Sequence, residues 1–229
     1  RDWSSDVCSS DLLDDTQVWR AHQNHKERLL RLAREESRAI FAQRTHEAGQ
    51  LVGSGVLLDP QVLTLGFARR FATYKRASLV FHDVERLIRI LTNPARPVQI
   101  VFAGKAHPAD HHGKLLLQEV YRATHDPRFE GRIAFIEDYD HHIAHLLVQG
   151  VDAWLNLPRV PLEACGTSGM KAALNGVPHI STLDGWWAEG ADGMNGWTVP
   201  TAERQEDDPG SDGKTANALY DLQIGRAHV

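Results

Sequence analysis

The chain has 229 residues, with 25 Lys and Arg against 30 Asp and Glu, so its formal net charge is −5. This mildly acidic balance does not favour broad nucleic-acid binding, which usually needs a strongly basic surface. No apolar run reaches the roughly 20 residues of a membrane-spanning helix, and the length suits one sizeable core with a helical appendage.

The two ends of the chain need a separate explanation. Residues 6–11 can be encoded by a DNA sequence whose reverse complement encodes residues 224–229. Because unrelated protein ends should not share this property, we interpret residues 1–12 and 223–229 as translated sequencing-library adapter and exclude them from the fold prediction. Cys165 is then the only authentic cysteine, so no intrachain disulfide is expected and a cytoplasmic location is favoured.

The first expected element is a helical lead-in segment over residues 13–58. Residues 14–44 are charged, lack Gly and Pro, and carry apolar residues at helical spacing. This pattern predicts one or two amphipathic helices, with Trp19 and Leu30 in the core. A turn region is expected next, around Gly49, Gly53 and Gly55.

Strands and helices alternate from residue 59 to residue 200. The expected strands are residues 62–67, 98–102, 132–136, 153–157 and 179–182. The expected helices are residues 74–91, 114–124, 143–149 and 168–175. Such alternation predicts an α/β fold with a Rossmann-like, doubly wound parallel sheet. Residues 201–222 are expected to form an acidic loop and the start of a C-terminal helix at 216–222.

Charged residues follow the predicted strands where ligands bind in a sheet of this kind. They are Arg69, Arg70, Lys75, Lys105, Glu163 and Lys171. If the loops share one edge of the sheet, these side chains form a cationic crevice with one carboxylate. A crevice of that charge suits phosphate, although each basic residue could also be an ordinary surface charge.

The run at residues 163–176 is the most informative part of the chain. Small residues, including Gly166 and Gly169, open a predicted helix that carries Lys171. Unpaired N–H groups and the helix dipole favour an anion at such a helix start. The pattern leaves open whether Lys171 neutralises a phosphate, condenses with an aldehyde or is solvated. The run is not a Walker P-loop, because G-x-x-x-x-G-K-[ST] is absent.

As a whole, residues 163–176 resemble the pyridoxal-phosphate lysine segment of the α-glucan phosphorylases, the glycogen, starch and maltodextrin phosphorylase family. Residues 66–76 resemble that family's phosphate-binding segment, and residues 104–108 and 135–139 resemble its next two loops, in the family's order and spacing. The resemblance runs from about residue 13 to residue 222 and points to the shorter bacterial and archaeal type. It implies the C-terminal domain of a two-domain GT-B glycosyltransferase fold.

The resemblance implies roles for individual residues. Lys171 takes the position of the lysine that binds pyridoxal 5′-phosphate as a Schiff base, which needs an amine shielded from water. The other implied cofactor contacts are Arg69, Tyr139, Thr167 and Ser168. The implied substrate contacts are Arg70 and Lys75 for phosphate, and Tyr74, Glu163, Cys165 and Gly166 for the sugar. The implied catalytic residues are Arg70, Lys75 and Lys171.

One residue departs from the family pattern. Cys165 stands where serine is usual. We expect the change to be tolerated if the backbone N–H makes the sugar contact, because a thiol side chain does not remove that donor.

The implied reaction is reversible phosphorolysis. Inorganic phosphate cleaves a terminal α-1,4-linked glucose from a glucan and releases α-D-glucose 1-phosphate with retained configuration. The expected partners are inorganic phosphate and α-1,4-glucan, with neither nucleic acid nor membrane, and the full-length enzyme could form a homo-oligomer. Half of the active crevice should come from a preceding domain, so the isolated chain is expected to be inactive. The alternative is a nucleotide-sugar-dependent glycosyltransferase of the same fold, similar to glycogen synthase.

Two further groups of residues are ambiguous. His141 and His145 are four residues apart on a predicted helix, but no cysteine or carboxylate completes an accepted metal-ligand spacing, so no metal is expected. A second group consists of aromatic residues, Trp186, Trp187 and Trp197. Both core packing and sugar stacking are compatible with these tryptophans.

Overall fold

The computed structural model describes residues 14–44, 57–201 and 210–222. The adapter interpretation of residues 1–12 and 223–229, the glycine turn at 49–55 and nearly all of the acidic loop at 201–209 fall outside these ranges. None of the helices within the described ranges is long and apolar enough to cross a membrane.

The described residues contain one sheet of six parallel strands in the order β3-β2-β1-β4-β5-β6. The strands are β1 Leu63–Ala68, β2 Val98–Ala103, β3 Ile133–Ile136, β4 Ala153–Asn156, β5 His179–Thr182 and β6 Gly196–Val199. Every residue of β1 and β2 is buried, as expected for central strands covered on both faces. The strand order reverses between β1 and β4, which confirms the doubly wound sheet and creates a switch point there.

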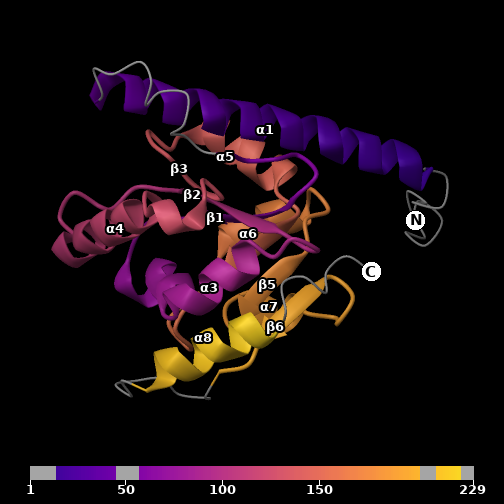
Figure 1. Ribbon diagram of the computed structural model, residues 1–229. Helices are drawn as coiled ribbons and strands as arrows, with labels where there is room; N and C mark the ends of the chain where they lie inside the picture. The colour runs from indigo at the N-terminus through magenta and orange to yellow at the C-terminus, as the bar shows by residue number, and fades with distance from the viewer. Residues whose placement is uncertain (1–13, 45–56, 202–209, 223–229) are drawn as a thin grey trace.

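Helices cover both faces of this sheet (Figure 1). The α-helices are α1 Asp15–Arg44, α3 Val84–Leu91, α4 His111–Thr124, α5 His141–Gly150, α6 Thr167–Ala173, α7 Trp187–Gly190 and α8 Ser211–Asp221. The 3-10 helices are η3 Thr73–Lys75, η4 Ala77–Phe81 and η5 Pro127–Phe129. Phe102 of β2 faces the core shared with α3, α4 and α8, while the next residue, Ala103, faces the core shared with α1 and α5.

The predicted continuous helix over residues 74–91 is wrong. The chain forms η3 and η4 first, and α3 begins only at Val84. Arg76 lies between the two 3-10 helices in the left-handed region, with φ 48°. Asp83 then caps α3, because its side chain accepts a hydrogen bond from the backbone N of Arg86 at 2.9 Å. The break allows Arg76 to turn inward toward the end of β4.

The prediction for α1 is half right. Leu30 is fully buried, but Trp19 is 59% exposed, so its assignment to the core is wrong. The last residue of α5, Gly150, packs against His25 and Leu29, and the first turns of α1 therefore extend past α5 (Figure 1). Helical spacing put Trp19 on the apolar face of α1, but no partner helix in the described residues covers that part of the face.

A buried ionic cluster fastens α1 to the N-terminal ends of β1 and β4. Lys26 Nζ lies 2.6 Å from Asp152 Oδ2, and His22 Nε2 lies 2.7 Å from Asp152 Oδ1. The backbone N of Thr64 donates to the same carboxylate at 2.7 Å, and Lys26 Nζ also donates to the carbonyl of Val62 at 2.9 Å. Burial raises the pKa of Asp152, but hydrogen bonds from His22 and Lys26 outweigh it, so the pKa is lowered overall.

Candidate active site

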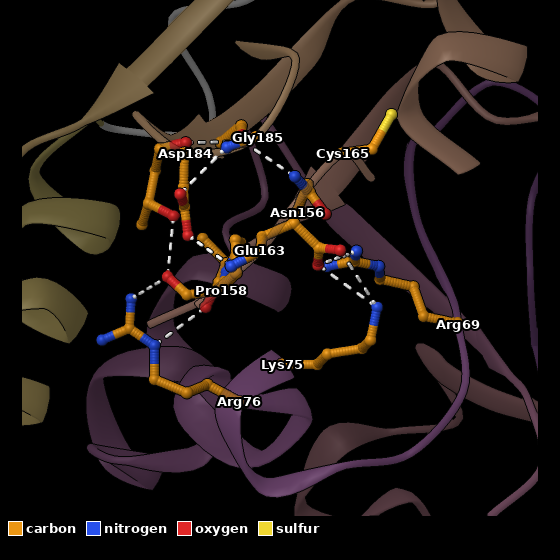
Figure 2. A network of polar contacts seen from close by, with 12 residues as sticks. Arg69, Lys75, Arg76, Asn156, Pro158, Glu163, Cys165, Asp184 and Gly185 are labelled. Carbon is orange, nitrogen blue, oxygen red and sulfur yellow. Dashed lines mark hydrogen bonds and ion pairs between the residues drawn. The ribbon is translucent and has the colours of Figure 1, made fainter. Parts of the chain in front are cut away.

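The candidate active site lies at the C-terminal edge of the sheet, where the chain leaves β1 and β4. Arg69 follows β1 directly, Lys75 ends η3, and Glu163 follows β4. The Glu163 carboxylate accepts a hydrogen bond from Arg69 Nη2 and lies 3.2 Å from Lys75 Nζ (Figure 2). All three residues are buried. The structure thus brings together two of the predicted cations and the predicted carboxylate.

The loop after β5 holds Glu163 in this position. Its backbone N donates to Asp184 Oδ2 at 2.8 Å, and Gly185 N donates to the other oxygen of the same carboxylate at 3.0 Å (Figure 2). Gly185 has φ +57°, and a Cβ there would lie 2.5 Å from the carbonyl oxygen of Cys165. Only glycine therefore permits this close approach of the loop after β5.

The crevice has more positive charge and more hydrogen-bond donors than its own residues use. Arg69 and Lys75 together carry two positive charges against one on Glu163. Arg69 Nε and Nη1 are buried and have no hydrogen-bond partner among the described residues, and the same is true of Ser168 Oγ. Buried donors are nearly always paired in folded proteins, so these atoms indicate a place for an anion.

Three further predicted site residues, Arg70, Tyr74 and Lys171, are more open to solvent than Arg69 and Glu163. Arg70 and Lys171 are exposed, and their side chains form no ion pair or hydrogen bond with the described part of the chain. Tyr74 is half-buried, and Lys75 Nζ lies 5.0 Å from the centre of its ring. The described residues therefore do not provide the shielding from water that the resemblance implies for Lys171.

The loop that opens α6 has the backbone shape expected of a close-approach turn. Gly166 is the N-cap residue of α6 and has φ 83°, a left-handed conformation that favours glycine. Thr167 is the first residue of the helix, and Cys165 is exposed, with Sγ 3.6 Å from Met170 Sδ. Because α6 spans only seven residues, side chains rather than a long helix dipole must supply most of the charge for an anion.

A separate groove lies beside β3, at the same edge of the sheet. Its volume is about 540 Å³, and its walls include Lys105, Tyr121, Glu137 and Asp138. Lys105 therefore lines this groove with two carboxylates instead of joining the ion pairs of Glu163. Tyr139 is half-buried against the α1 and α5 core, and burial raises the pKa of its phenol.

Sequence reasoning missed two residues that build the crevice. In the sequence, Asp184 is only the first residue of an Asp-Gly pair after a strand, and Arg76 is only one of several basic residues close together. Neither pattern predicts a role in the site. The Arg76 guanidinium donates to the carbonyls of Leu157 and Pro158, both at 2.8 Å, and burial lowers its pKa (Figure 2). Arg76 thereby fixes the loop that leads from β4 to Glu163.

The aromatic residues near the crevice divide into two classes. Trp187 is buried and stacks on His179 with ring centroids 5.1 Å apart, while Trp186 meets the edge of the same imidazole. His179 Nε2 lies 2.9 Å from the carbonyl of Gly169, and burial lowers the pKa of His179. These rings support α6 by core packing. Trp197 is 37% exposed and belongs to neither the core nor the crevice.

Within the described ranges, no group of three or more His, Cys, Asp or Glu side chains could hold a metal ion.

A family model described as carbohydrate phosphorylase matches residues 3–193. The chain belongs to the carbohydrate phosphorylase family. The predicted family and the α/β fold are thus confirmed, and the sheet with its flanking helices is consistent with one domain of a GT-B fold.

Named members of this family are closely similar to the chain. It is 50% identical to a glycogen phosphorylase of Aquifex aeolicus, 45% to one of Mycobacterium tuberculosis and 44% to a maltodextrin phosphorylase of Thermococcus litoralis, each over 210 residues. Each comparison covers 92% of this chain but only 30%, 24% and 25% of the respective relative. The chain thus spans less than a third of the length of these phosphorylases.

Proposed function

We propose that this chain is the cofactor- and phosphate-binding part of a pyridoxal-phosphate-dependent α-1,4-glucan phosphorylase. The observation that carries the proposal is the buried guanidinium of Arg69, which keeps two unpaired donors beside Lys75. Leaving such donors unpaired costs free energy, and a phosphate group supplies several acceptors and negative charge together.

The residues around α6 fit a phosphorylated aldehyde cofactor. The exposed Lys171 offers an amine that can bond covalently to the aldehyde, while Arg69 and Ser168 offer unpaired donors to the phosphoryl group. The phenol of Tyr139 can donate a hydrogen bond, and burial, which raises its pKa, favours this protonated form further. When bound, the cofactor would supply a phosphoryl group that exchanges a proton with the substrate phosphate.

The chain's own residues would bind and orient the second phosphate. Arg70 presents a guanidinium to solvent that can bind phosphate in bidentate fashion, and Lys75 adds a point charge from inside the crevice. An incoming phosphate would also compete with Glu163 for Lys75. A released Glu163 carboxylate could accept hydrogen bonds from sugar hydroxyls, which is the role that the family resemblance implies for it.

The full-length enzyme would carry out reversible phosphorolysis of α-1,4-glucan to α-D-glucose 1-phosphate with retention, in the cytoplasm and with the option of a homo-oligomer. Because Lys171 and Arg70 are open to solvent in this chain, we expect the 229-residue chain alone to show no phosphorolysis of maltodextrin. Release of glucose 1-phosphate by the chain alone would contradict this expectation.

The cofactor assignment can be tested on the chain itself. After incubation with stoichiometric pyridoxal 5′-phosphate and reduction with borohydride, peptide mapping should find the pyridoxyl group on Lys171. The exposed Lys114 and Lys214 serve as internal controls for nonspecific labelling. Arg69→Ala should reduce the selectivity for Lys171, because it removes the donors for the phosphoryl group. Equal labelling of all three lysines, together with binding of a nucleotide sugar, would favour the glycogen synthase-like alternative.

A further inference from the structure

Two exposed tryptophans line one cavity at the N-terminal edge of the sheet, opposite the candidate active site. Trp19 on α1 is 59% exposed and Trp197 on β6 is 37% exposed, whereas Trp154 and Trp187 are buried. The cavity has a volume of about 600 Å³ and reaches Leu63 at the start of β1. This volume lies in the range of ordinary small-ligand sites.

Amide side chains surround the two indole rings. Gln23, Gln61 and Asn175 line the same cavity. Asn175 Nδ2 donates to the carbonyl of Lys171 at 2.8 Å, which leaves Asn175 Oδ1 as an acceptor. The side-chain amides of Gln23 and Gln61 form no hydrogen bond with any described residue. Because a side-chain amide both donates and accepts, these groups can pair with hydroxyls in either sense.

The buried charges that line the cavity cancel one another, and the further charged side chain in its lining is the exposed carboxylate of Asp15. Lys26 and Asp152 form an ion pair of 2.6 Å, and His22 bonds to the second oxygen of the same carboxylate. No basic side chain in this cluster is left with unsatisfied positive charge, in contrast to Arg69 in the crevice. The cavity therefore suits a neutral ligand rich in hydroxyl groups better than a phosphate or a nucleotide.

We propose that this cavity binds a short stretch of α-glucan away from the active site, with pyranose rings stacked on Trp19 and Trp197. The indole rings would contact the apolar C–H faces of the sugars, and the amides would bind their hydroxyls. Trp19 on α1 and Trp197 on β6 belong to different elements, so the two rings would engage different sugar units. The identity of the sugar rests on the proposed function.

A site at this edge would act by tethering. It lies at the opposite ends of the strands from Arg69 and Glu163, so one polymer chain could occupy it without blocking the crevice. Binding a polymer at one place raises the effective concentration of its other chain ends near the catalytic residues.

Calorimetric titration of the chain with maltoheptaose tests the proposal. Trp19→Ala and Trp197→Ala should each weaken binding by about tenfold, the equivalent of losing one aromatic contact. Trp19→Phe should retain most of the affinity, because it keeps an aromatic face. Leu115→Ala is the matched control, since Leu115 is also exposed but lies on α4 outside the cavity. This variant should bind maltoheptaose with the affinity of the unchanged chain.

Two results would overturn the proposal. The first is unchanged maltoheptaose affinity in both tryptophan-to-alanine variants, which would place any sugar binding elsewhere. The second is the absence of sugar binding together with self-association that Trp19→Ala abolishes, which would make this face a contact between copies of the chain. Labelling of Lys171 by the cofactor involves neither tryptophan, so failure here and failure of the proposed function can be told apart.

Discussion

The buried charges at the two edges of the sheet are compensated to different degrees. At the N-terminal edge, both oxygens of Asp152 are engaged by His22, Lys26 and the backbone of Thr64. At the C-terminal edge, one carboxylate serves two cations, and Arg69 keeps two unpaired donors. The comparison indicates that a polar cluster that holds the fold together is closed, whereas one that awaits a ligand is left open.

The largest expected effect comes from removing the charge of Asp152 in the cluster at the N-terminal edge. Asp152→Asn keeps the shape of the side chain but leaves Lys26, which is 2% exposed, without a counter-charge. We expect the free energy of unfolding, measured by urea denaturation, to fall by about 3 kcal/mol or more. Asp221→Asn is the control, because Asp221 pairs with Arg86 at the surface and should change stability by less than about 1 kcal/mol. Equal losses in the two variants would remove the special role of the buried cluster.

Removing the carboxylate charge at the C-terminal edge should cause a loss of stability that a bound anion can reverse. Glu163→Gln removes the counter-charge of Arg69 and Lys75, and we expect a loss of about 2 kcal/mol in phosphate-free buffer. Of the two cations left without a counter-charge, Lys75 has a side chain 11% exposed and Arg69 one only 2% exposed, so Arg69 should account for most of the loss.

Inorganic phosphate distinguishes the two edges directly. Phosphate should restore most of the stability of Glu163→Gln by occupying the place of the carboxylate, and it should leave Asp152→Asn unchanged. Chloride at equal ionic strength controls for screening. If phosphate stabilises both variants or neither, the open edge does not differ from the closed one in the way that the structure indicates.

His179 and Asp152 should lose their contributions to stability in different pH ranges. Burial lowers the pKa of His179, so near pH 6.5 the unfolded chain binds a proton that the folded chain does not. The stability from neutral His179 is therefore present above about pH 6.5 and is lost as the pH falls from there toward the lowered folded pKa. Asp152 also has a lowered pKa, but its contribution stays present above about pH 3.9 and is lost below it.

This difference can be measured as the pH dependence of unfolding. Between about pH 6.5 and pH 5, the unchanged chain should lose stability, because the unfolded chain takes up a proton that folded His179 does not. His179→Gln should remove that step while leaving the later acid transition, because the amide does not titrate there. A step of equal size in His179→Gln would assign it to another group.

Local pattern was enough to predict the sheet, because central strands buried on both faces are continuous apolar runs. It also predicted that Arg69, Lys75 and Glu163 lie together, whereas Lys105, placed in the same crevice by the prediction, lines a separate groove. The break in the helix predicted over residues 74–91 was not predictable in this way. Apolar spacing continues through it, and the cause is the contact of Arg76 with carbonyls at residues 157 and 158, far away in sequence.

The missed features share a dependence on distant partners. Trp19 has the spacing of a core residue, and only the place where α5 ends leaves it exposed. Strand β6 was missed because its central residues, Trp197 and Thr198, are exposed and give no buried apolar run. The support of Glu163 by Asp184 was likewise hidden, since Asp184 lies in another loop and bonds to the backbone of Glu163.

The smallest expected effect tests the departure from the family pattern at position 165. The Cys165 side chain is exposed and contacts Met170 Sδ, while its carbonyl accepts a hydrogen bond from the backbone of Trp186 at 2.8 Å. Cys165→Ser keeps that backbone contact, so stability should change by less than about 0.5 kcal/mol, and the yield of pyridoxyl-Lys171 should stay the same. Gly185→Ala is the contrasting variant, because its Cβ would lie 2.5 Å from the Cys165 carbonyl oxygen and should disturb the loop strongly. A large loss of labelling in Cys165→Ser would mean that the side chain at this position, and not only its backbone, shapes the cofactor loop.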